Sequence, residues 1–180
     1  SFDDQTVTAA TADNDSAGFT KSKSAVSVSE SGTTETFTVV LNIEPGSDVV
    51  ISVTSGDTGE ATVSAASLTF TDSNWDTAQS IGVTGVDDDI IDGSQDTTIT
   101  LAVVDGSSDD NFDSLANQTV TAATADNDSA GFTVTQSGGS TQVAESGSMD
   151  TFTAVLTAQP ASDVVISVTS GDTGEATVSA

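Results

Sequence analysis

Two long segments of this sequence occur twice, and the spacing between the copies limits what the chain can fold into. Residues 5–20 recur without change as residues 118–133, an offset of 113 residues, and residues 47–65 recur as residues 162–180, an offset of 115 residues. Repeats of this length are large enough to be separate domains, each with its own hydrophobic core. The sequence therefore predicts a window from a tandem array.

The positions of the copies divide the 180 residues into three parts. We predict the closing strand of a preceding repeat at residues 1–15, one complete repeat at 16–128, and the first half of a following repeat at 129–180. A single strand and half a sandwich leave unpaired strand edges, which pair readily with other strands. We therefore expect the incomplete ends to associate with neighbouring repeats or with other copies of the chain.

Within the complete repeat, apolar residues alternate with Thr, Ser and other polar residues, as at Phe37, Val39 and Leu41, and turn residues interrupt the runs. This two-residue period is typical of half-buried strands. Seven strands are predicted, at residues 17–29, 34–43, 48–54, 61–71, 79–86, 96–104 and 118–125. Seven short strands in one repeat indicate an all-β fold, an Ig-like antiparallel β-sandwich of two sheets.

The charge of the chain is almost entirely negative. Asp and Glu number 28 against two Lys, the formal net charge is -26, and there is no Cys and no His. The missing residue types exclude disulfides, thiol nucleophiles, imidazole bases and the usual zinc ligands. The charge disfavours nucleic acid as a partner, and no apolar run reaches the roughly 18 residues of a membrane span. Cations are the expected partners, although an acidic surface suited to saline surroundings would explain the same composition.

Acidic residues are concentrated in the connections that follow alternate predicted strands. If consecutive strands reverse direction, the first, third, fifth and seventh strands all end at the same pole of the sandwich. Their exits carry Glu30, then Asp57 and Glu60, then residues 87–92, and finally residues 126–128. We therefore expect four acidic connections to converge at one pole.

Converging carboxylates repel one another unless a cation binds between them. Calcium takes about 6 to 8 oxygen ligands from carboxylates and carbonyls, and a site without His or Cys argues against zinc and copper. We therefore predict two or more Ca²⁺ ions at this pole. The alternative is that the acidic turns are only solvated strand ends, and this is the interpretation that we favour for the acidic loop 105–113 at the opposite pole.

Three motifs of the complete repeat are similar to those of the Calx-beta domain. They are Val-Ser-Val-Ser-Glu ending at Glu30, Asp-Asp-Asp-Ile ending at Ile90, and Asp-Asn-Asp-Ser-Ala-Gly-Phe ending at Phe132. The chain thus resembles a family found in sodium/calcium exchangers, in an integrin and in tandem arrays of bacterial surface proteins. The string from Leu68 through Trp75 to the Asp-Asp-Asp motif looks most like repeats of giant bacterial adhesins. The resemblance implies a seven-stranded Ig-like sandwich that binds calcium at one end.

The resemblance also implies ligands at the positions that match the motifs of the family. These positions are Glu30, Glu60, Asp87, Asp88, the carbonyl of Ile90, Asp92, Asp126 and Asp128, and the converging connections add Asp57 and Asn127 as candidates. Glu60 stands where the exchangers have Asp, and Asn127 and Gln95 replace acids, which bears on the number and affinity of the ions. Partial sites of the neighbouring repeats are expected at Asp13, Asp15, Glu145, Asp172 and Glu175.

Near-identical tandem repeats are typical of large surface proteins. We expect a calcium-stiffened structural or adhesive repeat, a spacer or fibre element of a secreted or cell-surface bacterial protein, and no enzyme. The alternative is a module that binds glycans or cells, with a cell-surface or matrix ligand as partner. It would use Trp75 and the outward rows of Thr, and repeated weak sites would add avidity. A Trp in a loop, however, more often covers a core. A glycosidase-like carboxylate pair is disfavoured, because every close pair of acids lies in a cluster better explained by metal.

Overall fold

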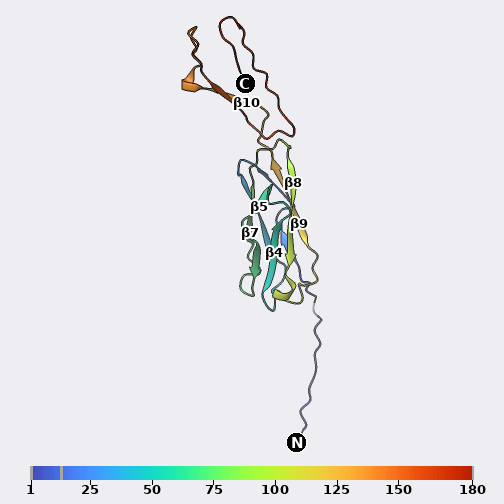
Figure 1. Cartoon of the computed structure of the whole chain (residues 1–180). Helices are drawn as coiled ribbons and strands as arrows, with labels where there is room; N and C mark the ends of the chain where they lie inside the picture. The colour runs from blue at the N-terminus through green and yellow to red at the C-terminus, as the bar shows by residue number, and fades with distance from the viewer. Residues whose placement is uncertain (1, 13, 180) are drawn as a thin grey trace.

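The computed structural model describes residues 2–12 and 14–179, so the predicted ligand Asp13 lies outside the described residues. The structure is almost entirely strand and loop (Figure 1). In chain order its elements are β1 (Phe19–Lys21), β2 (Ala25–Ser29), β3 (Thr34–Leu41), β4 (Val49–Ser55), β5 (Ala61–Val63), β6 (Ser67–Phe70), β7 (Gln79–Gly85), β8 (Gln95–Val103), the 3₁₀ helix η1 (Asp105–Ser107), β9 (Gln118–Ala125), β10 (Phe132–Gln136), the 3₁₀ helix η2 (Ser137–Gly139) and β11 (Phe152–Leu156).

Strands β1 to β9 form the two sheets of a β-sandwich, which confirms the predicted fold class. One sheet has the order β1-β3-β7-β5 and the other the order β2-β9-β8-β4-β6. The strand count differs from the prediction, because residues 17–29 supply both β1 and β2, and residues 61–71 supply both β5 and β6. Each of these segments crosses from one sheet to the other, the first across residues 22–24 and the second across residues 64–66. The strands are also not all antiparallel, since β2 pairs with β9 in parallel.

The core lies between the sheets and is made of the inward side chains of both. Phe37, Val39 and Leu41 are buried on β3, as their two-residue spacing predicts. Trp75 is half-buried and packs against the core, in agreement with the interpretation of this Trp as a core lid. Phe112 was missed by the strand pattern, because it lies in the acidic loop 105–113, yet it is 1% exposed.

The two ends of the chain leave the sandwich at opposite poles (Figure 1). Residues 2–12 form no strand and are exposed, so the predicted closing strand in residues 1–15 is not formed in the part described. The following half repeat forms the hairpin β10–β11, in which Phe132 lies opposite Leu156, as Phe19 lies opposite Leu41 between β1 and β3. A strand needs partners for its backbone groups, and residues 2–12 have no sheet to join.

Among the described residues, no helix is long and apolar enough to cross a membrane.

Candidate metal centre

The parallel pairing of β2 with β9 places the ends of these two strands side by side. Ser29 lies opposite Ala125 at the last position of the ladder, so Glu30 and Asp126 leave the sheet together. The backbone N–H of Glu30 continues the pairing by donating to the Ala125 carbonyl at 3.1 Å. Glu30 is 2% exposed, and a carboxylate is rarely buried so deeply unless it is paired. The sheet, and not a loose loop, therefore fixes the first acidic residue of the site.

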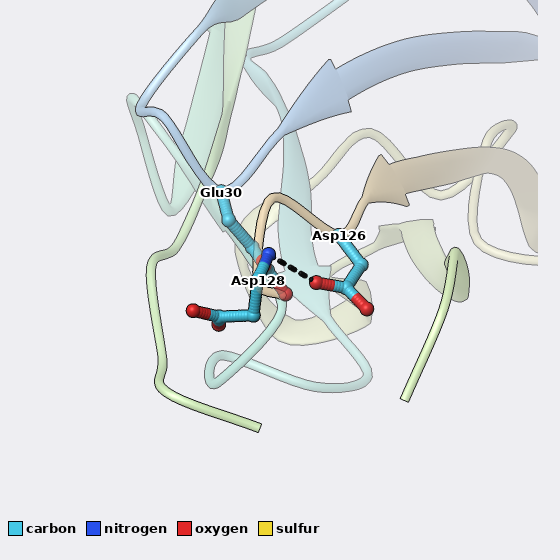
Figure 2. Close-up of side chains that lie close together, drawn as sticks. All are labelled: Glu30, Asp126 and Asp128. Carbon is cyan, nitrogen blue, oxygen red and sulfur yellow. Dashed lines mark hydrogen bonds between the residues drawn. The ribbon is translucent and has the colours of Figure 1, made fainter. Parts of the chain in front are cut away.

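Glu30, Asp126 and Asp128 form a cluster that we call the acidic triad (Figure 2). One carboxylate oxygen from each residue lies within 4.8 Å of those of the other two. Two oxygens that bind one calcium ion lie at most about 5 Å apart, because each is about 2.3–2.6 Å from the ion. The spacing of the triad therefore fits a shared cation.

Backbone N–H groups hold two of the three carboxylates of the triad in place. The Asn127 N–H donates to Glu30 Oε2 at 2.9 Å, and the Asp128 N–H donates to Asp126 Oδ1 at 2.6 Å, the bond drawn in Figure 2. Asp128 Oδ2, in contrast, is buried and has no hydrogen-bond partner among the described residues. A buried acceptor without a donor costs free energy. A cation bound by the triad would remove this cost.

The loop 87–92, which follows β7, is tied to the closing segment of the repeat. The Asn127 side chain donates from Nδ2 to Asp87 Oδ1 at 2.8 Å, and the Gly93 N–H donates to Asp126 Oδ2 at 2.9 Å. Gly93 has a φ of 74°, a left-handed conformation that favours glycine. These two hydrogen bonds therefore hold the loop beside the triad, while the side chains of Asp87, Asp89 and Asp92 stay exposed.

Gly85, the last residue of β7, allows the exits of β2 and β7 to approach each other. A Cβ atom at this position would lie 2.2 Å from the Ser29 carbonyl oxygen. Any side chain would push the loop 87–92 away from Glu30. Gly85 and Gly93 were not predicted as residues of the site, although a glycine at a strand end and one closing an Asp-rich loop are signals of close backbone approach and of a tight turn.

A second group of carboxylates lies beside the triad. Asp57, Glu60 and Asp92 line one hollow, together with Gln95, whose side-chain Nε2 donates to the Asp92 carbonyl at 3.1 Å. Glu60 lies directly before β5, and its carbonyl accepts a hydrogen bond from the Val86 N–H at 2.9 Å. The connection after β4 is thereby attached to the connection after β7, and the two bring these acids together.

Burial and neighbouring carboxylates raise the pKa of Glu60 and of Asp128 at this pole. Burial, and then the charges of Asp92 and Asp88, raise the pKa of Glu60 above its ordinary value. Burial, and then the charge of Asp126, raise the pKa of Asp128. Both groups would be more easily ionised if a cation replaced the repulsion by attraction.

Glu30 and Asp126 are affected in opposite directions. The hydrogen bond from the Asn127 N–H lowers the pKa of Glu30, but burial and the neighbouring acids outweigh it, and the pKa is raised. The pKa of Asp126 is lowered, first by the hydrogen bond from the Asp128 N–H and then by that from Gly93. Within the triad, Asp126 is thus the carboxylate that is most readily charged, and Glu30 and Asp128 are those that gain most from a cation.

Most of the predicted ligand positions therefore lie at one pole. The triad contains Glu30, Asp126 and Asp128, and the second group contains Asp57, Glu60 and Asp92. Asp87 and Asn127 hydrogen-bond each other beside the triad. Asp88 is close enough to raise the pKa values of Glu30, Glu60 and Asp128. The side chain of Ile90 is 42% exposed, and its N–H donates to Asp88 Oδ1 at 2.7 Å. Asp89 was not among the predicted ligands, although its charge also raises the pKa of Asp128.

The partial sites of the neighbouring repeats are not assembled in the same way. Asp15, Glu145, Asp172 and Glu175 are all exposed. Among the described residues, the Asp172 side chain makes only a local turn, in which Oδ1 accepts from the Gly174 N–H at 2.9 Å, just as Asp57 Oδ1 accepts from the Gly59 N–H at 2.8 Å. The turn forms without a sandwich, whereas burial of the acids requires one.

The acidic loop 105–113 at the opposite pole contains a buried carboxylate of a different kind. Asp109 is 7% exposed, and its Oδ2 accepts from the N–H groups of Gly46 at 2.6 Å and Ser47 at 3.1 Å. Its Oδ1 accepts from the N–H and the side chain of Asn111, both at 2.9 Å. These bonds, led by the one from the Asn111 N–H, lower the pKa of Asp109. Our interpretation of this loop as a solvated turn is wrong for Asp109, which binds the turn after β3.

No protein-family model and no curated protein matches the chain. Among solved structures, the chain is similar to the E. coli chaperone DraB, with 7% identity and a TM-score of 0.45 over 63% of this chain and 57% of that chain. It is also similar to a structure from a chaperone-tip adhesin complex of CFA/I fimbriae, with 11% identity and a TM-score of 0.44 over 66% and 60%.

A third similar structure is SSP-19, an MSP-domain-like protein of Caenorhabditis elegans, with 15% identity and a TM-score of 0.40 over 59% of this chain and 97% of that chain. The chain spans 57% of the DraB structure and 60% of the structure from the fimbrial complex. At TM-scores below 0.5, these likenesses give no indication of function.

Proposed function

We propose that this chain is a stretch of a calcium-stiffened structural or adhesive repeat, a spacer or fibre element of a large secreted or cell-surface protein, built from Calx-beta-like domains. The observation that carries the proposal is the acidic triad. Glu30 is almost fully buried against Asp126 and Asp128, and Asp128 Oδ2 is buried without a partner among the described residues. Only oxygen ligands are present, which favours Ca²⁺ over zinc or copper.

The place of the triad in the chain supports a role in stiffening. Asp126 and Asp128 come directly after β9, the last strand of the sandwich, and the next strand, β10, begins at Phe132. A cation bound to Asp126, Asp128 and Glu30 would join the start of the linker to the end of β2. The linker 129–131 would then leave the sandwich in a fixed direction, and successive repeats would form a rod.

The mechanism is linkage between binding and folding. An ion that binds the folded repeat and not the unfolded chain stabilises it by about 2.7 kcal/mol per site at a hundredfold excess over Kd. The second group, Asp57, Glu60 and Asp92, gives a place for a further ion. Trp75 packs against the core, so no observation favours the alternative of a glycan-binding module.

Differential scanning calorimetry and small-angle X-ray scattering with calcium and with a chelator test the proposal. Saturating calcium is expected to raise Tm by roughly 10–20 °C, because about 1 kcal/mol shifts Tm by about 4–8 °C in a domain of this size. It is also expected to narrow the distribution of particle dimensions. Sodium chloride at matched ionic strength is the control for general screening. Equal Tm values and dimensions with calcium and with chelator would contradict the proposed function.

A further inference from the structure

The following half repeat contacts the acidic pole of the sandwich through its backbone. The Gln159 N–H donates to the Asp89 carbonyl at 2.6 Å, and Ile90 and Gln159 form an isolated parallel β-bridge. Gln159 lies three residues after β11, in the turn that follows the second strand of the hairpin β10–β11. One turn of the next repeat therefore adds a short piece of strand to the acidic loop 87–92.

The same turn also holds the linker. Thr157 Oγ1 donates to the Ser129 carbonyl at 2.8 Å, and the Thr157 N–H donates to the Gly131 carbonyl at 3.0 Å. Ser129 directly follows Asp128 of the acidic triad. Residues 157–159 thus contact the acidic loop 87–92 directly, and they also contact the linker that follows the closing segment 126–128.

The complete repeat carries the equivalent turn at its opposite pole. The Asn42 N–H donates to the Gly18 carbonyl at 2.9 Å, as Thr157 does to Gly131 in the next repeat, so Glu44 corresponds to Gln159. The Asp109 carboxylate holds this turn by accepting hydrogen bonds from the N–H groups of Gly46 and Ser47. Each repeat therefore has a donor turn at one pole and an acceptor loop at the other.

We propose that these two surfaces form a repeat-to-repeat joint, in which the turn of residues 42–46 donates to the 87–92 loop of a preceding copy of the same repeat. The inference rests on the proposed function, because it describes how a spacer would be kept straight. Head-to-tail contacts generate extended arrays when the rotation between successive copies does not close a ring. The joint uses backbone N–H and carbonyl groups, which is why it tolerates Glu at position 44 and Gln at position 159.

In this joint, Asp109 is a positioning residue, because its hydrogen bonds to Gly46 and Ser47 fix the backbone of the turn. The acidic loop has a matching function at the other pole, because the hydrogen bonds of Asp87 with Asn127 and of Gly93 with Asp126 fix the segment that presents the Asp89 carbonyl. Bound metal and joint would therefore share one rigid loop.

Amide hydrogen exchange of the full chain, followed by NMR in calcium and in chelator, tests the joint. After correction for intrinsic rates, the Gln159 amide is expected to exchange roughly tenfold more slowly than the Glu44 amide in calcium, as one hydrogen bond of ordinary net strength would give. Glu44 is the internal control, because its N–H has no backbone partner among the residues that the structure describes. Equal exchange of the two amides in both conditions would overturn the proposal.

A pair of proline variants makes the test independent of exchange rates. Gln159→Pro removes the N–H that donates to the Asp89 carbonyl. Glu44→Pro makes the same change at the equivalent turn of the complete repeat, where the N–H has no backbone partner among the described residues. Residual dipolar couplings are expected to show β10–β11 losing its common alignment with the sandwich in Gln159→Pro only. Common alignment in both variants would contradict the joint. Failure of the proposed function is recognised separately, by a Tm of the wild-type chain that calcium does not change.

Discussion

The two poles of the sandwich are both acidic, but Asp109 at one pole and the acidic triad at the other have opposite surroundings. At one pole, Asp109 accepts four hydrogen bonds from N–H donors, and its pKa is lowered. At the other, Glu30 and Asp128 face further carboxylates, and their pKa values are raised. The difference shows that a high density of Asp and Glu does not define a metal site. Asp113, in the loop of Asp109, also has an Oδ1 that is buried without a partner among the described residues, and its pKa is raised. What distinguishes the candidate site is therefore that three carboxylate oxygens lie within reach of one cation.

The largest expected effect concerns the pole of Asp109, opposite the candidate metal site. Asp109→Ala would leave the N–H groups of Gly46, Ser47 and Asn111 without their acceptor, and we expect a loss of about 3 kcal/mol or more in the free energy of unfolding. Urea denaturation should give the same loss in calcium and in chelator. Asp110→Ala, at an exposed neighbour, is the control and should change stability by less than about 0.5 kcal/mol. A loss that depends on calcium would erase the distinction between the poles.

Glu30→Gln should act in the opposite way, through calcium. The Gln side chain keeps an oxygen that can accept from the Asn127 N–H but loses the charge, so the variant is expected to lose about 2.7 kcal/mol of calcium-dependent stabilisation at a hundredfold excess over Kd. In chelator the variant should be at least as stable as the wild type, because a repelled, buried charge is removed. Glu44→Gln is the matched exposed control. The hypothesis fails if calcium stabilises Glu30→Gln as much as the wild type.

The smallest effect is on the pH dependence of stability in chelator, and its sign differs between the poles. The raised pKa values of Glu30 and Glu60 give stability that is full below their ordinary value of 4.5 and is lost as pH rises through the raised values. The lowered pKa of Asp109 gives stability that is full above its ordinary value of 3.8 and is lost as pH falls through the lowered value. Thermal melts should therefore show a maximum near the acidic end of the range.

Two variants test which carboxylate causes the loss of stability on each side of this maximum. Glu30→Gln should flatten the decline above pH 4.5, and Asp109→Asn should flatten the decline below pH 3.8, each without affecting the other side. Wild-type stability that rises steadily from pH 4.5 to 7 in chelator would show that repulsion between the carboxylates of the candidate site is not significant.

The sequence predicted the sandwich because inward residues repeat every second position, and this periodicity survives in the structure from Val26 to Leu101. It could not predict which copies of a repeated segment become strands. Residues 118–125 form β9, while the identical residues 5–12 form none, and Val49 on β4 is fully buried, while its copy Val164 is 53% exposed. The difference lies in the partner strands, which local propensity does not encode.

The candidate site was predictable to a similar extent. The alternating direction of the strands was enough to predict that the four acidic connections lie at one pole. Residues 17–29 and 61–71 each form two strands instead of one, but the same connections still meet at that pole. The parallel pairing of β2 with β9, which places Glu30 beside Asp126, was not predicted. Nor was the burial of Asp109, because nothing in the acidic loop distinguishes one Asp from the next until Phe112 anchors the loop in the core.

Isothermal titration of calcium into the full chain at pH 7, with Glu30→Gln as the matched variant, tests the central claim most directly. The wild type is expected to bind with saturable heat and a stoichiometry of at least one ion, which Glu30→Gln should reduce or abolish, and magnesium should bind more weakly because it requires a stricter octahedron. Saturable heats of equal size in the two proteins, or no saturable heat in the wild type, would contradict a calcium site at Glu30, Asp126 and Asp128.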